Sequence, residues 1–163
     1  MTRRRRSAID RVVRGAAAGA AGTTALNAIT YADILLRARP SSDVPAKMAG
    51  VLAGHAGLRF LALENETEAA QHRRQAVGAL LGYMTGAAIG AAYGVIQPSL
   101  GRPSRLAAGL ALGLSAMAAS DIPFAVTGVS DPRTWSLTDW LSDTVPHLIY
   151  GLATATIYGL EGD

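Results

Sequence analysis

Two ionisable residues, Asp121 and His147, lie within long apolar stretches in the second half of the chain. A charged side chain inside a membrane is costly, so it normally faces a partner or water and marks a candidate proton or solute site. Asp143 precedes His147 by four residues. On a helix this spacing puts both on one face, where the carboxylate can hydrogen-bond the imidazole ring. These residue types could hold or pass a proton if the helices bring them together.

Three further polar residues are predicted to lie at the same depth on other segments. At 1.5 Å per helical residue, Asp121 and His147 each lie about 10–12 Å inside the outer end of their segments. Tyr83 reaches a similar level, and Asn27 and Tyr31 bracket that level. The sequence therefore predicts a polar cluster in the outer half of a helical bundle. A hydrogen-bond network that only fixes helix register would use the same residues, and this interpretation stays open.

Four apolar segments must position these side chains. A helix needs about 20 apolar residues to cross the hydrocarbon core, and residues 76–96 carry no charge over 21 residues. The other three segments are residues 12–36, 106–129 and 140–160. We predict an all-α fold, a four-helix transmembrane bundle in a single membrane domain, with the lipid bilayer as its first partner.

The basic residues before the first segment set the expected orientation. Six of the fifteen Lys and Arg residues precede Gly15, and the remainder of the chain has nine basic against eleven acidic residues. A basic cluster ahead of an apolar segment holds that end in the cytoplasm. We expect residues 1–14 to be cytoplasmic and the protein to lie in the inner (plasma) membrane. A cleaved signal peptide is the weaker interpretation, because residues 15–28 lack a compact Leu-rich run.

The connection of residues 39–75 is long enough to have structure of its own. Asp43 before Pro45 is typical of a helix start, so we predict a short helix lying on the outer membrane surface. Three potential metal ligands share a helical face in the same connection, but an exposed face of this kind is usually only solvated, and we expect no metal. They are Glu64, Glu68 and His72.

A five-helix alternative has residues 48–63 crossing the membrane as well. It would bring Arg73 and Arg74 to the cytoplasmic side, where the positive-inside rule favours them. It would also expose Arg102 and Arg105 on the outside. We prefer four helices, and the alternative stays open.

Glycines recur at every fourth position of the second segment. In a membrane such a stripe lets a partner backbone approach closely, as in a glycine zipper, and the last segment carries a shorter one. This pattern predicts helix packing within one chain or between copies of it. The residues are Gly78, Gly82, Gly86, Gly90, Gly94, Gly151 and Gly159.

The second half of the chain also shows a family resemblance. Residues 120–123 (Ser-Asp-Ile-Pro), 130–135 (Ser-Asp-Pro-Arg-Thr-Trp) and 140–151 carry it. They resemble small, uncharacterised multi-pass inner-membrane proteins of high-GC bacteria, loosely similar to the YagU-like proteins. The resemblance covers mainly residues 106–160. It implies an inner-membrane helical bundle and no particular activity.

Recognisable catalytic motifs are absent from the sequence, and there is no cysteine. No phosphate-binding loop, nucleophile elbow or zinc motif is present, and no base-reading residues accompany the arginines. We therefore expect a non-enzymatic membrane protein with no cofactor and no nucleic-acid partner: a structural or accessory subunit, or a small homo-oligomer. The alternatives are a small transporter or channel that uses the polar cluster, and a lipid-directed enzyme with His147 as base and Asp143 as its orienting group.

Overall fold

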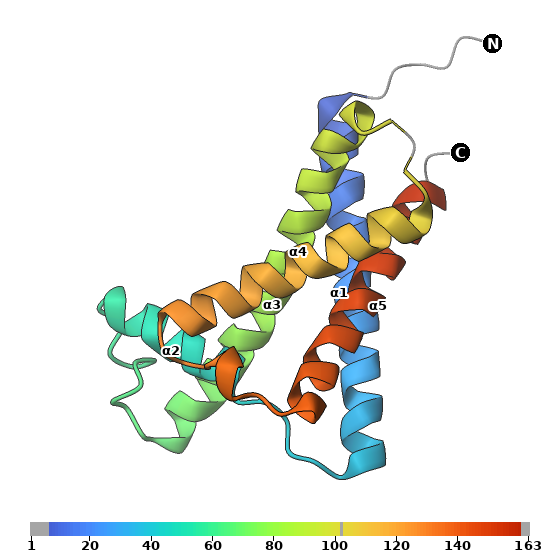
Figure 1. Ribbon diagram of the computed structural model, residues 1–163. Helices are drawn as coiled ribbons and strands as arrows, with labels where there is room; N and C mark the ends of the chain where they lie inside the picture. Colours follow the sequence, from blue (N-terminus) through green and yellow to red (C-terminus); the bar gives the residue numbers. More distant parts are fainter. Residues whose placement is uncertain (1–6, 102, 161–163) are drawn as a thin grey trace, which may run out of the picture.

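The computed structural model describes residues 7–101 and 103–160, and in these residues it is all-α, as predicted. Five helices and two short 3₁₀ turns follow one another, with no strand in the described part of the chain (Figure 1). They are α1 (Ala8–Arg37), α2 (Val44–His55), α3 (Glu68–Ile96), η1 (Gln97–Ser99), α4 (Arg105–Val126), η2 (Pro132–Thr134) and α5 (Leu137–Leu160).

Local capping residues set the helix starts. Ser7 and Asp10 form a capping box, in which the Ser7 hydroxyl accepts from the Asp10 amide at 3.0 Å and the Asp10 carboxylate accepts from the Ser7 amide at 3.1 Å. Thr67 and Ser104 cap α3 and α4 in the simpler one-bond form. The Thr67 cap begins α3 at Glu68, so two polar turns precede the predicted apolar segment.

The four long helices alternate in direction, and α1 lies at the centre of the arrangement. It packs along both α3 and α5, and α5 packs in turn along α4. Figure 1 shows the start of α1 and the end of α5 at the same end of the molecule. Toward the opposite end, α1 and α3 diverge (Figure 1). The long helices therefore cross closely at one end and open at the other.

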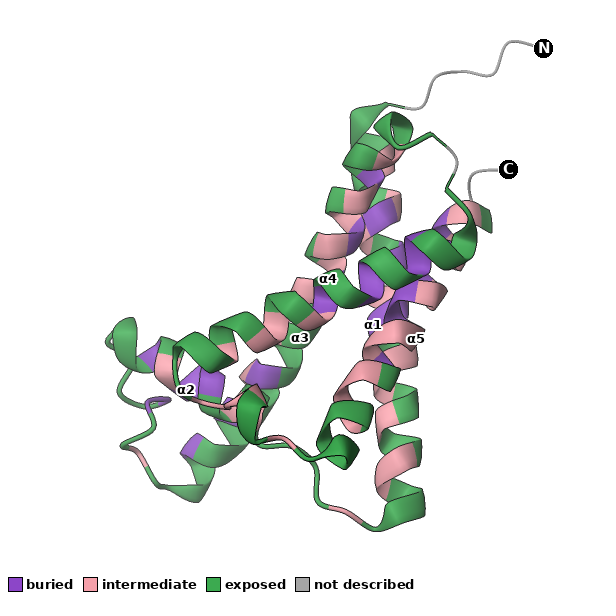
Figure 2. Cartoon of the chain, viewed as in Figure 1, coloured by how far each residue is buried: buried purple, intermediate pink, exposed green. Residues whose placement is uncertain are grey.

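Small side chains fill the crossings. Most positions buried between the long helices are Gly, Ala or Thr, together with Tyr150 and Tyr158. Figure 2 shows these buried positions gathered where the helices cross, with exposed residues along the outer faces and the free ends. Large aliphatic side chains lie on those outer faces instead, among them Leu80 and Leu114. The helix backbones can therefore approach closely.

The first connection contains a short helix, as predicted. α2 has 12 residues, about 18 Å at 1.5 Å per residue, which is too short to cross a bilayer of about 30 Å. It packs on α3, and residues 56–67 turn back toward the start of α3. Residues 48–63 therefore do not form one continuous helix, as the five-helix alternative requires, because α2 ends at His55.

By length and apolar character, two helical stretches in the described part of the chain are suited to crossing a membrane: Glu68–Ser99 and Arg105–Val126. Only 17% and 22% of their apolar windows are buried within the chain, unlike the core helix of a water-soluble protein, which is mostly buried. α1 and α5 do not combine this length with the same apolar character. Charged and hydroxyl-bearing residues dilute the apolar character of these two helices.

Candidate functional site

Asp121 on α4 lies beside Asp143 and His147 on α5, as their predicted depths implied. Asp121 lies close enough to Asp143 and His147 to interact with both electrostatically. Nδ1 of His147 lies 2.8 Å from the Asp143 carbonyl oxygen and 3.4 Å from the Asp143 carboxylate. Ser120 stands between the helices: its hydroxyl lies 3.3 Å from the Asp121 carboxylate and 3.5 Å from Nε2 of His147. Four polar side chains thus meet at one level of the α4–α5 interface.

Glycine brings the two backbones together at this level. A Cβ added to Gly113 of α4 would lie 2.7 Å from the His147 carbonyl oxygen and 3.1 Å from the Leu148 Cα. A larger residue would push α5 away from α4. One turn of helix further from the site, Gly151 packs against Gly109 and Gly113 in the same way. The close backbone contact therefore sets the distance across which Asp121 faces α5.

One atom of this group has no partner. Oδ2 of Asp143 is buried and accepts no hydrogen bond, although Oδ1 faces the His147 ring. The side chains of Asp143 and His147 are only 23% and 15% exposed. Leaving a buried carboxylate oxygen without a donor costs about 1–3 kcal/mol or more, so a proton donor is expected here.

The other three predicted cluster members lie elsewhere. Tyr83 of α3 shares a hydrogen bond of 3.3 Å with Thr24 of α1, and Asn27 of α1 lies near the same tyrosine hydroxyl. Tyr31 is 65% exposed. In the described part of the chain, no hydrogen bond or ion pair joins this α1–α3 group to Asp121. The prediction of one cluster is thus corrected to two, because depth along a helix does not fix which neighbour a side chain faces.

Five of the seven predicted packing glycines lie close to another helix. Four of these glycines are on α3 and one is on α5. At Gly86, Gly90 and Gly94 an added Cβ would come within 3.0 Å of α1 atoms, and at Gly78 within 3.0 Å of Pro45 at the start of α2. Gly151 meets α4 in the same way. Two members differ: Gly82 has open space around it, and Gly159 has only Arg105 Nε at 3.7 Å.

Sequence reasoning missed the most deeply buried polar contact. Tyr150 of α5 is 1% exposed, and its hydroxyl donates to the Gly86 carbonyl of α3 at 2.7 Å. Thr154, which is fully buried, donates back to the Tyr150 carbonyl at 2.8 Å. The signal available in the sequence was a tyrosine and a threonine close to Gly151, on the helix face that carries the small residues. A buried tyrosine usually finds a partner for its hydroxyl, so a bond across the helices could have been predicted there.

Two arginines also have structural roles that the sequence did not predict. Nη1 of Arg74, a buried residue, donates to the carbonyls of Ala62 at 2.8 Å and Asn65 at 2.9 Å and fastens the connection to α3. At the end of α1, Arg37 pairs with Asp33 and also donates to the Ser142 hydroxyl of α5. These contacts tie the open end of the arrangement together.

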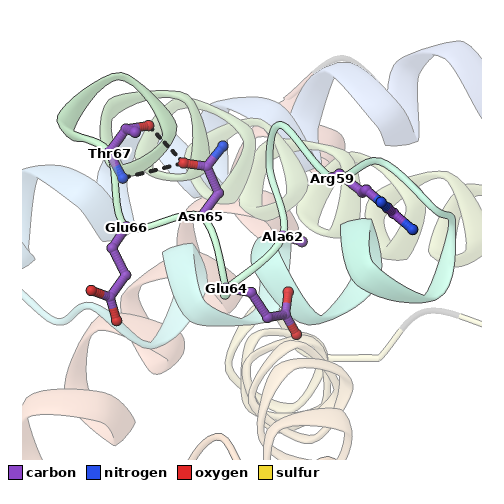
Figure 3. A pocket seen from close by; sticks show the side chains of 6 residues that line it. All are labelled: Arg59, Ala62, Glu64, Asn65, Glu66 and Thr67. Atoms are coloured by element: carbon purple, nitrogen blue, oxygen red, sulfur yellow. Dashed lines mark hydrogen bonds between the residues drawn. The ribbon is translucent and has the colours of Figure 1, made fainter.

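The most evident hollow, of about 760 Å³, lies in the connection before α3 and is lined by Arg59, Ala62, Glu64, Asn65, Glu66 and Thr67. Figure 3 shows its charged side chains pointing away from one another. Asn65 turns inward and accepts from the Thr67 hydroxyl at 2.7 Å and from its amide at 3.2 Å. No binding chemistry converges there. Among the described residues, no group of three acidic, His or Cys side chains is placed to hold a metal ion.

The connection between α4 and α5 is ordered by its own side chains. The Asp131 carboxylate accepts from the Arg133 guanidinium at 2.9 Å and 3.0 Å, which lowers the pKa of Asp131. The Asp139 carboxylate accepts from the Ser136 amide at 2.9 Å and from the Ser136 hydroxyl at 2.6 Å. The Trp135 and Trp140 rings meet edge to face, with centroids 5.0 Å apart. This turn fixes the start of α5 and hence the level of Asp143.

Comparisons of the chain with known protein families, with curated proteins and with solved structures gave no match. The resemblance to YagU-like proteins stays a prediction.

Proposed function

We propose that the chain is a non-enzymatic integral membrane protein in which α1, α3, α4 and α5 all cross the bilayer. The observation that carries this proposal is the distribution of side-chain size. Gly, Ala and Thr occupy the helix crossings, whereas large aliphatic side chains point outward. A water-soluble bundle buries Leu, Ile and Val in its core. Helices in lipid pack through small residues and leave the large apolar ones facing the hydrocarbon.

The outward apolar surface is extensive. Val126, Leu35, Met84, Leu80 and Leu106 are between 60% and 81% exposed, and they lie on three different helices. Exposed apolar patches of more than a few hundred Å² on a protein mark contact with a partner or a membrane. At about 25 cal/mol per Å², covering such a surface with lipid stabilises the inserted state by several kcal/mol for each helix. The same surface in water would promote aggregation.

The helix lengths fit the bilayer. α4 with 22 residues and α5 with 24 residues extend about 33 and 36 Å at 1.5 Å per residue, against a hydrocarbon thickness of about 30 Å. α1 and α3 are longer still and would reach into the headgroup region or tilt. The Trp135–Trp140 pair lies at the start of the proposed crossing of α5, at a position suited to the membrane–water interface.

Within the membrane we propose a structural or accessory role, as a subunit of a larger complex or as a small homo-oligomer. The open Gly82 position and the apolar faces beside it support this role, because they leave a surface to which another helix can dock. The basic residues before α1 support a cytoplasmic amino terminus in the inner membrane. Native mass spectrometry of gently extracted protein distinguishes a homo-oligomer from a single copy bound to other subunits.

Thiol labelling tests the membrane placement, because the chain has no cysteine of its own. Leu114→Cys introduces a thiol at a position that is 56% exposed. We expect a membrane-impermeant maleimide to leave it unlabelled in intact membranes and to label it after solubilisation in denaturant. Asp131→Cys, in the connection before α5, is the matched control and should react from one side of the membrane. Equal labelling rates at the two positions in intact membranes would contradict the proposal.

A second candidate function is transport of a proton or a small solute. The meeting of Asp121, Asp143 and His147 between two proposed membrane helices favours it, since such groups within a membrane mark ion pathways. Asp121→Asn in proteoliposomes should abolish proton or solute flux, with Asp131→Asn as the control. Unchanged flux in Asp121→Asn would contradict transport and leave the structural role in place.

A further inference from the structure

We propose that the end of the bundle at which α1 begins binds an anionic phospholipid of the surrounding leaflet through Arg11, Arg14 and Arg105. We call the surface formed by these three residues the arginine end. The group that it recognises is the lipid phosphate at the membrane surface. This inference rests on the proposed membrane placement and adds a class of ligand to it.

The side chain of Arg14 is held in place by α5. Its Nη2 donates to the Tyr158 carbonyl oxygen at 3.0 Å, and its guanidinium carbon lies 5.2 Å from the centroid of the Tyr158 ring. That ring meets the Tyr93 ring of α3 edge to face, with centroids 5.2 Å apart. A carbonyl and a ring face are both uncharged, so these contacts orient the guanidinium without cancelling its charge. A side chain oriented in advance loses less entropy when it binds an anion.

Arg11 and Arg105 lie at the same end of the bundle. A Cβ added to Gly94, near the end of α3, would lie 2.2 Å from the Arg11 carbonyl oxygen, so α1 and α3 touch at this level. Nε of Arg105, at the start of α4, lies 3.7 Å from the position of a Cβ on Gly159, near the end of α5. The fold therefore gathers arginines of α1 and α4 beside the last residues of α3 and α5.

The charge of the described residues is uneven along the bundle. They hold ten Lys or Arg and ten Asp or Glu side chains in all. The three arginines of the arginine end are accompanied by one acid, Asp10, so the rest of the described chain has seven basic against nine acidic side chains. The sequence adds four arginines before Ser7 and two acids after Leu160. Positive charge is therefore in excess at this end alone.

Arginines at the opposite end of the bundle are paired with acids beside them. Arg37 pairs with Asp33, and Arg133 pairs with Asp131. Each such pair is neutral as a unit, so it attracts a phosphate only weakly. An anionic lipid therefore favours the arginine end, and the bundle discriminates between the two leaflets by charge.

The arginine end also lies where the apolar helix stretches begin. Residues 15–32, directly after Arg14, carry no charge, and neither do residues 106–120, directly after Arg105. Leu106, the first of the second stretch, is 60% exposed. With these stretches in the hydrocarbon, the guanidinium groups reach the headgroup level. Phosphate lies at that level, and arginine binds it through parallel N–H donors. Basic clusters at this position are typical of sites for anionic lipids.

Native mass spectrometry of the purified full chain, titrated in one detergent with phosphatidylglycerol or with phosphatidylcholine, tests the proposal. We expect the wild type to bind phosphatidylglycerol more tightly, because phosphatidylcholine carries a cation of its own. One arginine beside an anionic lipid surface changes the affinity about fivefold. Arg14→Gln and Arg105→Gln should each weaken phosphatidylglycerol binding by about that factor and leave phosphatidylcholine binding unchanged. Arg133→Gln, at the opposite end, is the matched control and should bind both lipids as the wild type does.

Equal affinity of the wild type for the two lipids would overturn the proposal, as would an unchanged preference in Arg105→Gln whose fold is verified by circular dichroism. Arg105 is exposed, so this variant decides the question even if loss of the Arg14–Tyr158 bond unfolds Arg14→Gln. Tighter binding of a short DNA duplex than of phosphatidylglycerol, in the same buffer, would assign the surface to nucleic acid and also overturn the proposal. Failure of the membrane placement is separate: a Leu114→Cys thiol that is freely labelled in membranes contradicts that placement, whatever the lipid titrations show.

Discussion

Replacing Gly90 by Ala tests whether the close approach of α1 and α3 holds the bundle together. A Cβ at Gly90 would lie within 3.0 Å of three backbone atoms of α1, one in Gly15 and two in Gly19. Backbone atoms cannot rotate away as a side chain can, so the helices must separate. Overpacking of this kind typically costs about 1–3 kcal/mol, which is about a 5- to 150-fold change in the unfolding equilibrium.

The same helix offers two matched comparisons. At Gly82 an added Cβ meets nothing within 4 Å, so Gly82→Ala should be neutral or slightly stabilising, since Ala is the better helix former. At Gly86 the nearest atom is the hydroxyl oxygen of the Thr23 side chain, which is more easily displaced than backbone. The expected order of destabilisation is therefore Gly90→Ala, then Gly86→Ala, then Gly82→Ala.

The measurement is the unfolding free energy of each variant, in one detergent, from denaturant titrations followed by circular dichroism. Equal stability of Gly90→Ala and Gly82→Ala would refute the argument, because the two substitutions add the same methyl group to the same helix. A loss of stability in Gly82→Ala alone would instead indicate that another helix, such as one from a second copy of the chain, packs against the open position.

Three further predictions concern single side chains. Tyr150→Phe removes a buried hydroxyl that donates across helices and should lower the unfolding free energy by about 0.6–1.5 kcal/mol, measured in the same titrations; no change would mean that the bond contributes nothing. Arg74→Ala removes the donor that fastens the connection before α3 and should speed limited proteolysis there, whereas Arg73→Ala, at an exposed neighbour, should not. The pKa of Asp131 is lowered by Arg133, so the stabilisation from this pair is complete above the ordinary Asp pKa of 3.8 and is lost as pH falls through the lower folded value; an NMR titration should show the pKa rising toward 3.8 in Arg133→Ala, and an unchanged value would contradict the ion pair.

Much of the secondary structure follows from the sequence alone. The helix predicted after Asp43 begins at Val44, although Asp43 makes no side-chain capping bond, and the apolar run of residues 76–96 lies within one helix. Asp143 and His147 face each other because helical spacing puts residues four apart on one side. The alternation in direction of α3, α4 and α5 follows from the short connections between them. Each of these is a property of neighbouring residues.

The crossings were decided by the tertiary structure. Gly82 and Gly90 have identical sequence signals, yet a Cβ added at Gly82 would meet nothing within 4 Å, whereas one at Gly90 would meet the α1 backbone. Depth along a segment brought Asp121 to the level of His147, but the same reasoning placed Tyr83 and Asn27 with them, whereas they face each other between α1 and α3. Periodicity gives the face and level of a residue on its own helix. Which helix covers that face depends on crossing angles, and these arise from the contacts of all the helices together.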